Sequence, residues 1–425
     1  MARISALLFL RDIPRDQKGK PILLREVLGL PLIERLFLAL KRSGINNIII
    51  IGDVSEDVEK AIIEISRKRE LCTALIGNGD INCIINTLSK SSSERFLIIL
   101  KPYLILEREL RRIIDEYYKN GGKLLVVIRG DGSISPKVSN QHREISEGIL
   151  LQMARNVVAT IVPRENIINL PRSLNLSKAT SLELLRAIIN DQKSHITIIR
   201  RGVFSISSTR ELRKLENYLL ASLKKPDDGF ISYYINRRIS ARISKFLVKT
   251  SLTPNMISII SFAMAAVAAY FFSIRNYLMS IIAGILTQMA SIIDGCDGEV
   301  ARLKGLSSKY GALFDTLLDR YADILLVIGI GYGYYLMTQN SLSLLLLAIP
   351  LTGFIMSSYA RKEYMIRYEK QPKGKLLLLI RRDFRLFGIF IGALIGMAYH
   401  AIITIGALSH IIIIIHYIIG QRRKE

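Results

Sequence analysis

Five aspartates stand within thirty residues of the second half of the sequence, in which long apolar segments follow one another. They are Asp294, Asp297, Asp315, Asp319 and Asp323. The first two are three residues apart and the next two are four apart, so each pair lies on one face of a helix. Carboxylates that converge repel one another unless a cation lies among them, and all-oxygen ligation suits Mg²⁺, Mn²⁺ or Ca²⁺. We therefore predict that the first four aspartates build a divalent metal site.

Small residues and one arginine stand at fixed distances from these aspartates. The stretch reads Asp294-x-x-Asp297-Gly298-x-x-Ala301-Arg302, followed after eight residues by Gly311-x-x-x-Asp315-x-x-x-Asp319. Position for position, this pattern resembles the signature of the CDP-alcohol phosphotransferase family. The resemblance covers roughly residues 228–425, and it includes the Thr-Pro-Asn sequence at 253–255.

The resemblance implies an integral membrane enzyme that transfers a substituted phosphate group from a CDP-alcohol to an acceptor alcohol and releases CMP. In this family the cleft holds the cytidine, and the aspartates hold two divalent ions, Mg²⁺ or Mn²⁺, that bridge the pyrophosphate. All four aspartates of the signature would be metal ligands, and Asp319 would also be the general base for the acceptor hydroxyl. By the same resemblance, the nucleotide-binding positions are Gly298, Ala301, Arg302 and Gly311.

Two other classes of protein also bring carboxylates together. Transporters and ion-binding membrane proteins bury them within their spans, and such a protein would bind metal without cleaving a nucleotide. Prenyl synthases bind Mg²⁺ and pyrophosphate through aspartate-rich motifs, but they are soluble helical bundles. The glycine, alanine and arginine positions favour the transferase over both.

Basic side chains downstream indicate the kind of acceptor. Arg361, Arg382 and Arg385 belong to a loop and a helix start, and guanidinium groups bind phosphate in a bidentate manner. We predict that they bind a phosphorylated acceptor, such as an inositol phosphate or a glycerol phosphate, although each could instead anchor a helix end at the lipid headgroups. The chain resembles archaeal di-myo-inositol-phosphate-phosphate synthases with a fused front domain, which implies CDP-inositol as donor. Phospholipid synthesis from CDP-diacylglycerol or an archaeal CDP-lipid is the alternative.

Long apolar segments must position these residues, because a helix needs about 20 mostly apolar residues to cross a bilayer. Six spans are predicted at 256–273, 277–297, 311–337, 341–360, 386–402 and 404–420. The last two would be separated by a turn near Gly406. The segment from Arg361 to Arg385 holds nine Lys or Arg and three acidic residues, so positive-inside logic places this loop, both termini and the active site in the cytoplasm. The protein would thus reside in the cell membrane, and the family resemblance implies a homodimer.

An amphipathic helix is predicted at 227–250, just before the first span. The residues Leu252-Thr253-Pro254-Asn255 then break this helix, with Pro254 placed to start the span. Its apolar stripe contains Ile231, Ile235, Ile239, Ile243, Phe246 and Leu247. Arginines and a lysine lie off the stripe, which suits a helix in the membrane interface. A soluble helix that packs on the front domain is the alternative.

The front half, residues 1–225, alternates strand patterns at 4–10, 47–52, 96–100 and 123–128 with helical stretches, and predicts a cytoplasmic α/β domain. Its opening resembles sugar-phosphate nucleotidyltransferases, which would make a CDP-alcohol from CTP. However, the glycine-rich phosphate loop is replaced by residues 10–16, which contain no glycine, and a metal-binding aspartate is replaced by Lys101-Pro102. We predict an inactive domain that serves docking, dimerisation or regulation. A bifunctional enzyme is the alternative.

Composition agrees with a membrane protein that acts on anionic substrates. Half of the residues are hydrophobic and the formal net charge is +23. The basic residues concentrate beside apolar segments, where they meet lipid headgroups, so no nucleic-acid partner is predicted. The three cysteines have no metal-binding or disulfide spacing.

Overall fold

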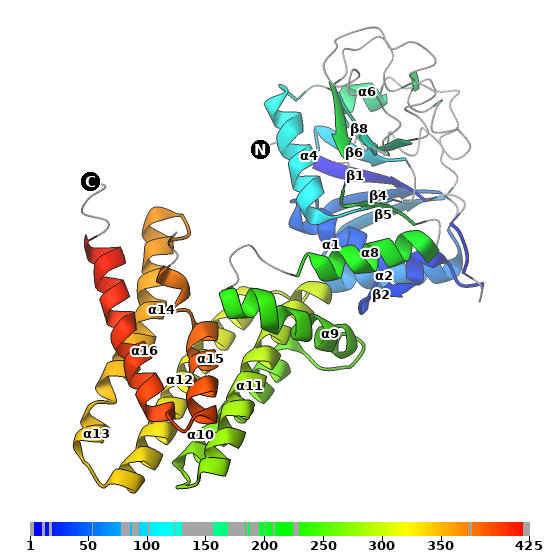
Figure 1. Cartoon of the computed structure of the whole chain (residues 1–425). Helices are drawn as coiled ribbons and strands as arrows, with labels where there is room; N and C mark the ends of the chain where they lie inside the picture. Colours follow the sequence, from blue (N-terminus) through cyan, green and yellow to red (C-terminus); the bar gives the residue numbers. More distant parts are fainter. Residues whose placement is uncertain are drawn as a thin grey trace. The chain divides into compact units, whose positions relative to one another are not determined.

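The structure is a computed structural model that divides into two compact units, Met1–Tyr218 and Leu219–Glu425 (Figure 1). It describes residues 4–10, 13–16, 19–52, 54–77, 86, 93–100, 103–122, 124–129, 156–168, 183, 186–187, 195–199, 201–206, 209–223, 229–372, 374 and 376–419. The domain boundary that the sequence predicts near residue 225 stays a prediction, because residues 224–228 lie outside the described part.

A seven-stranded mixed sheet forms the centre of the first unit (Figure 1). In spatial order its strands are β10 (His195–Ile199), β8 (Leu125–Arg129), β9 (Val157–Pro163), β6 (Arg95–Ile99), β1 (Ile4–Phe9), β4 (Asn47–Ile51) and β5 (Cys72–Ile76). Strand β9 runs antiparallel to both of its neighbours, and the remaining pairs are parallel.

The helices of this unit are α1 (Leu32–Arg42), α2 (Glu56–Arg69), α4 (Glu107–Lys119), α6 (Arg164–Ile168), α8 (Thr209–Ala221) and the short η1 (Ile22–Leu24). Two small antiparallel pairs join β2 (Glu26–Val27) to β3 (Leu30–Pro31) and β7 (Tyr103–Ile105) to β11 (Val203–Ser205).

The central strands are continuous runs of apolar residues, because helices and loops cover both faces of a largely parallel sheet. Every residue of β1 is buried, and four of the five residues of β4 are buried. The strands that the sequence predicts at 4–10, 47–52, 96–100 and 123–128 are confirmed, with ends shifted by no more than two residues. The structure does not describe residues 11–12 and 101–102, which belong to the two segments where the sequence departs from the nucleotidyltransferase pattern.

The second unit is helical (Figure 1). Its elements are η3 (Ser232–Asn236), α9 (Arg237–Leu247), α10 (Pro254–Ser273), α11 (Tyr277–Leu303), α12 (Lys309–Thr338), α13 (Leu342–Leu345), α14 (Ala348–Tyr368), η4 (Leu376–Leu378), α15 (Arg382–Leu394), α16 (Ala398–Ile413) and η5 (Ile414–Ile419). Helix α10 packs against α11 and α12, while α15 joins α11 to α16 and α16 packs on α14. The predicted start of the first span is confirmed, since Thr253 caps α10 by accepting from the Met256 N–H and Pro254 is the first helical residue.

Within the described part, four helical segments are long and apolar enough to cross a membrane. They are Pro254–Ser273, Tyr277–Leu303, Leu342–Tyr368 and Ala398–Ile418. Helices α12 and α15 are not among them, and α15 has only 13 residues, so the number of six spans stays a prediction. The turn predicted near Gly406 is wrong. The chain turns at Ile395–Met397, where Gly396 has a φ of 74°, and Gly406 lies inside α16, where the backbone of Pro350 leaves no room for a side chain.

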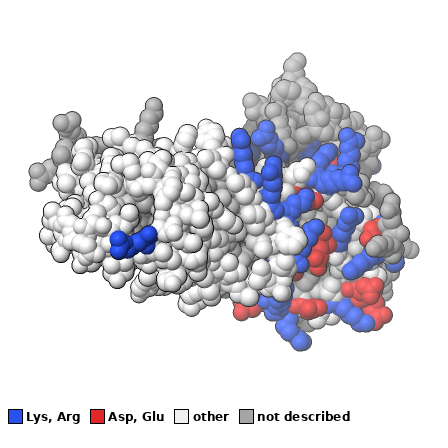
Figure 2. Space-filling view, turned by 60° about the horizontal axis from the view of Figure 1, so that its bottom comes forward, with Lys and Arg blue, Asp and Glu red and all other residues white. Residues whose placement is uncertain are grey.

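One face of this unit is apolar, as a lipid environment requires. Figure 2 shows a face of the helical unit on which almost no charged side chain appears. Exposed apolar side chains of its helices include Val267, Leu278, Ile328, Leu345 and Ile411. The helical unit is therefore built for integration into a membrane.

Two glycines let α12 approach α10 closely. A Cβ on Gly329 would collide with the backbone carbonyl of Ala269, and a Cβ on Gly333 would collide with the carbonyl of Phe272. Between apolar helices in lipid, such small residues allow the van der Waals contact that replaces the hydrophobic driving force. The packing of α10 on α12 matters for function because both helices contribute to the site described below.

Replacing Gly329 with alanine is expected to lower the stability of the protein in detergent by about 1–3 kcal/mol, because a backbone carbonyl cannot move aside and the helices must separate. Gly331→Ala is the matched control on the same helix, since the three atoms nearest to its Cβ belong to the side chain of Leu347, which can move more easily than a backbone carbonyl. Melting temperatures of the two purified variants provide the measurement. Equal melting temperatures would show that the contact between α10 and α12 does not limit stability.

Helix α9 packs on α11 through its polar side. Ser240 and Ser244 are buried, and each donates a 2.7 Å hydrogen bond to the carboxylate of Glu299, which is fully buried on α11. Arg237 completes this set with an ion pair of 2.7 Å to Glu299. On the outer side, the exposed apolar and aromatic residues are Phe230, Tyr233, Tyr234, Ile235, Ile239 and Phe246. The exposed side of the helix therefore has the composition expected of a membrane-interface helix.

Candidate active site

Three of the predicted metal-binding aspartates converge. One carboxylate oxygen each from Asp294 on α11 and from Asp315 and Asp319 on α12 lie within 4.8 Å of one another. The i, i+4 spacing of the two aspartates of α12 places them on the same face, as the sequence predicts. Among the described residues, this is the group of acidic, histidine and cysteine side chains that could hold a metal ion.

Asp297 lies beside this group and is held from α10. Its carboxylate accepts a 2.5 Å hydrogen bond from the Ser258 hydroxyl and a second bond from the Gly298 N–H, and the residue is only 8% exposed. It also lies close enough to Asp315 for the two carboxylates to interact. All four aspartates of the signature therefore gather where α10, α11 and α12 meet.

The predicted nucleotide-binding residues line the same region. Gly298, Ala301 and Arg302 belong to the last turns of α11, and a Cβ on Gly298 would lie 3.3 Å from the Arg302 guanidinium. Gly311 lies in the first turn of α12, where its N–H donates a 2.9 Å hydrogen bond to the capping hydroxyl of Ser308. A Cβ at Gly311 would stand 3.5 Å from the Asn255 side chain, so glycine keeps the surface between α10 and α12 open.

Arg382 enters the aspartate cluster from the start of α15. Its Nη1 lies 2.9 Å from Asp294 Oδ2 and 2.6 Å from Asp319 Oδ1. Its Nε lies 3.2 Å from Asp323 Oδ1. In this structure the Arg382 guanidinium therefore neutralises carboxylates. The sequence did not indicate this role, because the residue type alone suggested that Arg382 binds phosphate.

Asp323 lies outside the signature, and yet it is the anchor for three arginines. In addition to Arg382, it pairs with Arg320 at 3.1 Å and with Arg385 at 2.9 Å. The residue is 3% exposed. The sequence analysis missed Arg320, although its i, i+3 spacing from Asp323 on one helix was a signal that could have identified the pair.

The other two predicted acceptor-binding residues differ in accessibility. Arg385 is 1% exposed, and its Nη1 donates 2.7 Å hydrogen bonds to the Phe354 carbonyl and to the Ser357 hydroxyl. It therefore connects α15 to α14, and it holds Ser357, which lines the larger of the cavities described next. Arg361 donates a 3.3 Å hydrogen bond to the Gln371 side chain and lines both of the cavities described next.

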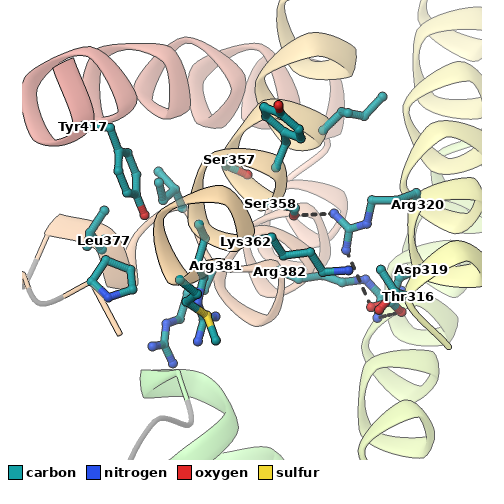
Figure 3. Close-up of a pocket in the computed structure, with 16 residues that line it drawn as sticks. Thr316, Asp319, Arg320, Ser357, Ser358, Lys362, Leu377, Arg381, Arg382 and Tyr417 are labelled. Carbon is teal, nitrogen blue, oxygen red and sulfur yellow. Dashed lines mark hydrogen bonds and ion pairs between the residues drawn. The ribbon is translucent and has the colours of Figure 1, made fainter. Parts of the chain in front are cut away.

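Two cavities meet at Asp319 and Arg382. The larger has a volume of about 540 Å³ and lies between α12, α14 and the loop before α15 (Figure 3). Figure 3 shows Arg320 and Arg382 both reaching toward Asp319 at one wall, where Ser358 accepts a 2.6 Å hydrogen bond from Arg320. Its cationic lining consists of Arg320, Arg361, Lys362, Arg381 and Arg382. The smaller cavity, of about 400 Å³, lies between α11, η3 and the same loop and is lined by Asp294, Asn236 and Arg237, among others.

The residues present fit a divalent metal ion. The converging donors are carboxylate oxygens, which are the ligands of hard divalent cations, and a cationic group already contacts two of the three carboxylates. Positive charge is therefore needed here, whether it comes from an arginine or from a metal. Next to this cluster, a cavity lined by cations is suited to an anionic substrate.

Comparisons with known proteins agree with this chemistry. The family model for CDP-alcohol phosphatidyltransferase matches residues 251–419. A "bifunctional IPC transferase and DIPP synthase" from Rubrobacter xylanophilus is 26% identical over 92% of this chain and 90% of the relative. An archaetidylinositol phosphate synthase from Pyrococcus horikoshii is 30% identical, and the match covers 43% of this chain and 92% of the relative. The first unit is similar to a putative glucose-1-phosphate thymidylyltransferase from Bacillus anthracis, with 11% identity, a TM-score of 0.39, and coverage of 51% of this chain and 94% of that structure.

The order of the two units is therefore as the sequence predicts, with an α/β unit followed by a helical unit that contains four segments able to cross a membrane. The family model lies on the helical unit, which carries the aspartate cluster. The chain belongs to the CDP-alcohol phosphatidyltransferase family and is a CDP-alcohol phosphotransferase.

Proposed function

We propose that the enzyme transfers a substituted phosphate group from a CDP-alcohol to a phosphorylated polyol. The first candidate for this acceptor is an inositol phosphate. The observation that carries this proposal is the 540 Å³ cavity, which contains Asp319 and five cationic side chains. A phosphate group on the acceptor would meet these cations, while its reacting hydroxyl would face the carboxylate. Arginine is suited to this task because its planar fork matches phosphate oxygens.

In the proposed mechanism, Asp319 is the general base. It borders both the aspartate cluster and the cavity, so it can accept the proton of an acceptor hydroxyl held there. The deprotonated oxygen then attacks the phosphorus atom of the transferred group. The bond between this phosphorus and the bridging oxygen of CMP breaks, and CMP leaves with the electron pair.

Asp294, Asp297 and Asp315, together with Asp319, would hold two divalent ions, Mg²⁺ or Mn²⁺. When bound, these ions supply positive charge that neutralises the pyrophosphate and the leaving CMP. Ser258 fixes the orientation of Asp297 by its 2.5 Å hydrogen bond, which supports a role as a ligand in a defined geometry. Gly298, Ala301 and Gly311 would border the nucleotide, because their small side chains leave backbone accessible at the cluster, and Arg302 would border it with its guanidinium group beside Gly298.

For the donor, CDP-inositol is proposed first. The Rubrobacter relative aligns over 92% of this chain and is named in part a DIPP synthase, which favours joining two inositol units through phosphate. The second candidate is a CDP-lipid donor, CDP-diacylglycerol or an archaeal counterpart. It is favoured by the Pyrococcus relative, whose name is archaetidylinositol phosphate synthase. Both candidates share an inositol phosphate as acceptor.

The first unit is proposed to be catalytically inactive. Residues 10–16 contain no glycine where nucleotidyltransferases wrap a triphosphate, and Lys101-Pro102 stands where they bind metal. A bifunctional enzyme is the alternative, because the Rubrobacter relative that aligns along both units is named bifunctional. Release of pyrophosphate from CTP and inositol phosphate would support the alternative.

The placement in the cell is also a proposal. Both termini and the aspartate cluster would lie on the cytoplasmic side, since the basic segment from Arg361 to Arg385 adjoins the cluster. The exposed aromatic and basic side of α9 would rest on lipid headgroups in the cell membrane. A homodimer through the helical unit is expected from the family.

The acceptor is tested by CMP release from the purified protein in detergent with Mg²⁺. CDP-inositol and CDP-diacylglycerol are each combined with inositol phosphate, glycerol phosphate or unphosphorylated inositol. We expect release with inositol phosphate and much less with inositol, because only the former provides an anion for the cationic cavity. Equal rates with the phosphorylated and unphosphorylated acceptors would contradict the proposed role of the cavity.

A further inference from the structure

Arg382 contacts two different sets of carboxylates with the two ends of its guanidinium group. The Nη1 end lies 2.9 Å from Asp294 and 2.6 Å from Asp319, which belong to the metal cluster. The Nε end lies 3.2 Å from Asp323, which does not. The side chain therefore bridges the metal cluster and a separate buried anion.

The Nη1 end competes with a divalent ion for the same ligands. Asp294 and Asp319 are two of the three carboxylates whose oxygens lie within 4.8 Å of one another. A divalent ion on these oxygens would repel a guanidinium in contact with them, and the repulsion is strong because the surroundings are buried and of low dielectric constant. Loading of the cluster is therefore expected to expel the Nη1 end.

The Nε end is held in a different way. Asp323 is 3% exposed and is fixed by Arg320 and by Arg385, and Arg385 is itself tied to α14 by two hydrogen bonds. Arg320 also lies 3.6 Å from Asp319, so it is Arg385 that holds Asp323 without an ion pair to the metal cluster. Because Nε is the guanidinium nitrogen nearest to the main chain, the Nε–Asp323 contact can act as a pivot about which the outer nitrogens turn.

The larger cavity offers space for the Nη atoms of Arg382. Arg382 lines the 540 Å³ cavity together with Arg320, Arg361, Lys362 and Arg381, and its side chain is 16% exposed (Figure 3). When turned away from Asp294 and Asp319, its Nη atoms would join this group of cations. The cavity would then bind a phosphate group more tightly.

We infer that Arg382 is an exchangeable counter-cation, which neutralises the aspartate cluster until metal binds and then turns on Asp323 to complete the acceptor phosphate site. The inference rests on the proposed function, since it takes the metal and acceptor sites from it. It makes Arg382 an acceptor-binding residue that couples the two sites, and Asp323 the positioning residue on which it turns. Because coupling between two binding sites is reciprocal, metal must strengthen acceptor binding by the same factor by which acceptor strengthens metal binding.

The test measures binding rather than turnover. Mn²⁺ affinity of the purified full-length protein in detergent is determined from the electron paramagnetic resonance signal of unbound Mn²⁺. Arg382→Gln is expected to tighten Mn²⁺ binding by about tenfold or more, because the ion no longer displaces charge-assisted hydrogen bonds. Inositol phosphate is expected to tighten Mn²⁺ binding in the wild type and to have little effect in the variant.

Arg381→Gln is the matched control, because it removes the same charge one position away in the lining of both cavities. It should tighten Mn²⁺ binding clearly less than Arg382→Gln. Arg382→Lys serves if the glutamine variant does not fold, since it keeps a charge but cannot bridge both carboxylate sets, and it should lose the coupling to inositol phosphate.

Unchanged or weaker Mn²⁺ binding in a folded Arg382→Gln protein would overturn the inference, as would equal tightening in Arg381→Gln. Failure of the proposed function would be visible separately, as absence of CMP release by the wild type. A wild type that releases CMP but shows no effect of inositol phosphate on Mn²⁺ affinity would reject the exchange alone.

Discussion

Asp319→Asn is expected to lower the rate of CMP release by about 10²- to 10⁴-fold, the usual contribution of a general base. The reason is geometric, because Asp319 belongs to the metal cluster and also borders the acceptor cavity. Asparagine keeps the size of the side chain but cannot accept the proton, and it provides a weaker metal ligand. The measurement is the initial rate of CMP release at saturating donor, acceptor and metal.

Thr316→Ser is the control for this variant. Thr316 lines the same cavity, one turn before position 319 on α12, and its hydroxyl donates a 2.8 Å hydrogen bond to the Ala312 carbonyl that serine can keep. Its rate should stay close to that of the wild type. If Asp319→Asn retained more than about a tenth of the activity, the assignment of the general base would be wrong.

Glu299→Ala is expected to cost about 3–5 kcal/mol of stability, because it leaves the partner of a buried ion pair without its counter-charge. Glu299 is fully buried and holds Arg237, Ser240 and Ser244 of α9. Loss of this contact would free α9 from α11, on which Asp294 and Asp297 lie. The measurement is unfolding of the purified protein in mixed detergent micelles.

A second glutamate–arginine pair is the matched control. Glu363 and Arg367 lie 2.6 Å apart, but their side chains are 33% and 71% exposed. Glu363→Ala should therefore change stability by less than about 1 kcal/mol, as is usual for exposed pairs. A similar loss of stability in both variants would mean that the burial of Glu299 does not increase the cost of removing its carboxylate.

The aspartate cluster could be predicted from the sequence because it depends on local spacing. The i, i+3 and i, i+4 positions fix which carboxylates share a helical face, and the family signature relates the two helices to each other. The cap of α10 at Thr253 and Pro254 was likewise readable, because it depends only on neighbouring residues. These features needed no knowledge of which helices pack together.

Contacts between distant segments could not be predicted. Arg382 stands 88 residues from Asp294 in the chain, and the packing of α15 against α11 brings the two together. It also contacts Asp323 of α12, which is 59 residues away in the chain. The role of Glu299 was missed for the same reason, although Asn236, Ser240 and Ser244 recur every four residues and mark a polar side of α9. The turn between the last two helices was misplaced at Gly406 because a glycine that permits close helix packing looks the same in sequence as a glycine that ends a helix.

The most direct test of the account follows both products of the reaction by phosphorus NMR. Purified protein in detergent is mixed with CDP-inositol, inositol phosphate and Mg²⁺, and the wild type is compared with Asp319→Asn. We predict that CMP and a new phosphodiester form in equal amounts in the wild type, that a chelator stops both, and that the variant forms neither at a comparable rate. Metal binding without CMP from any CDP-alcohol, or CMP without a coupled phosphodiester, would contradict the claim that this cluster transfers a phosphate-linked group to an acceptor alcohol.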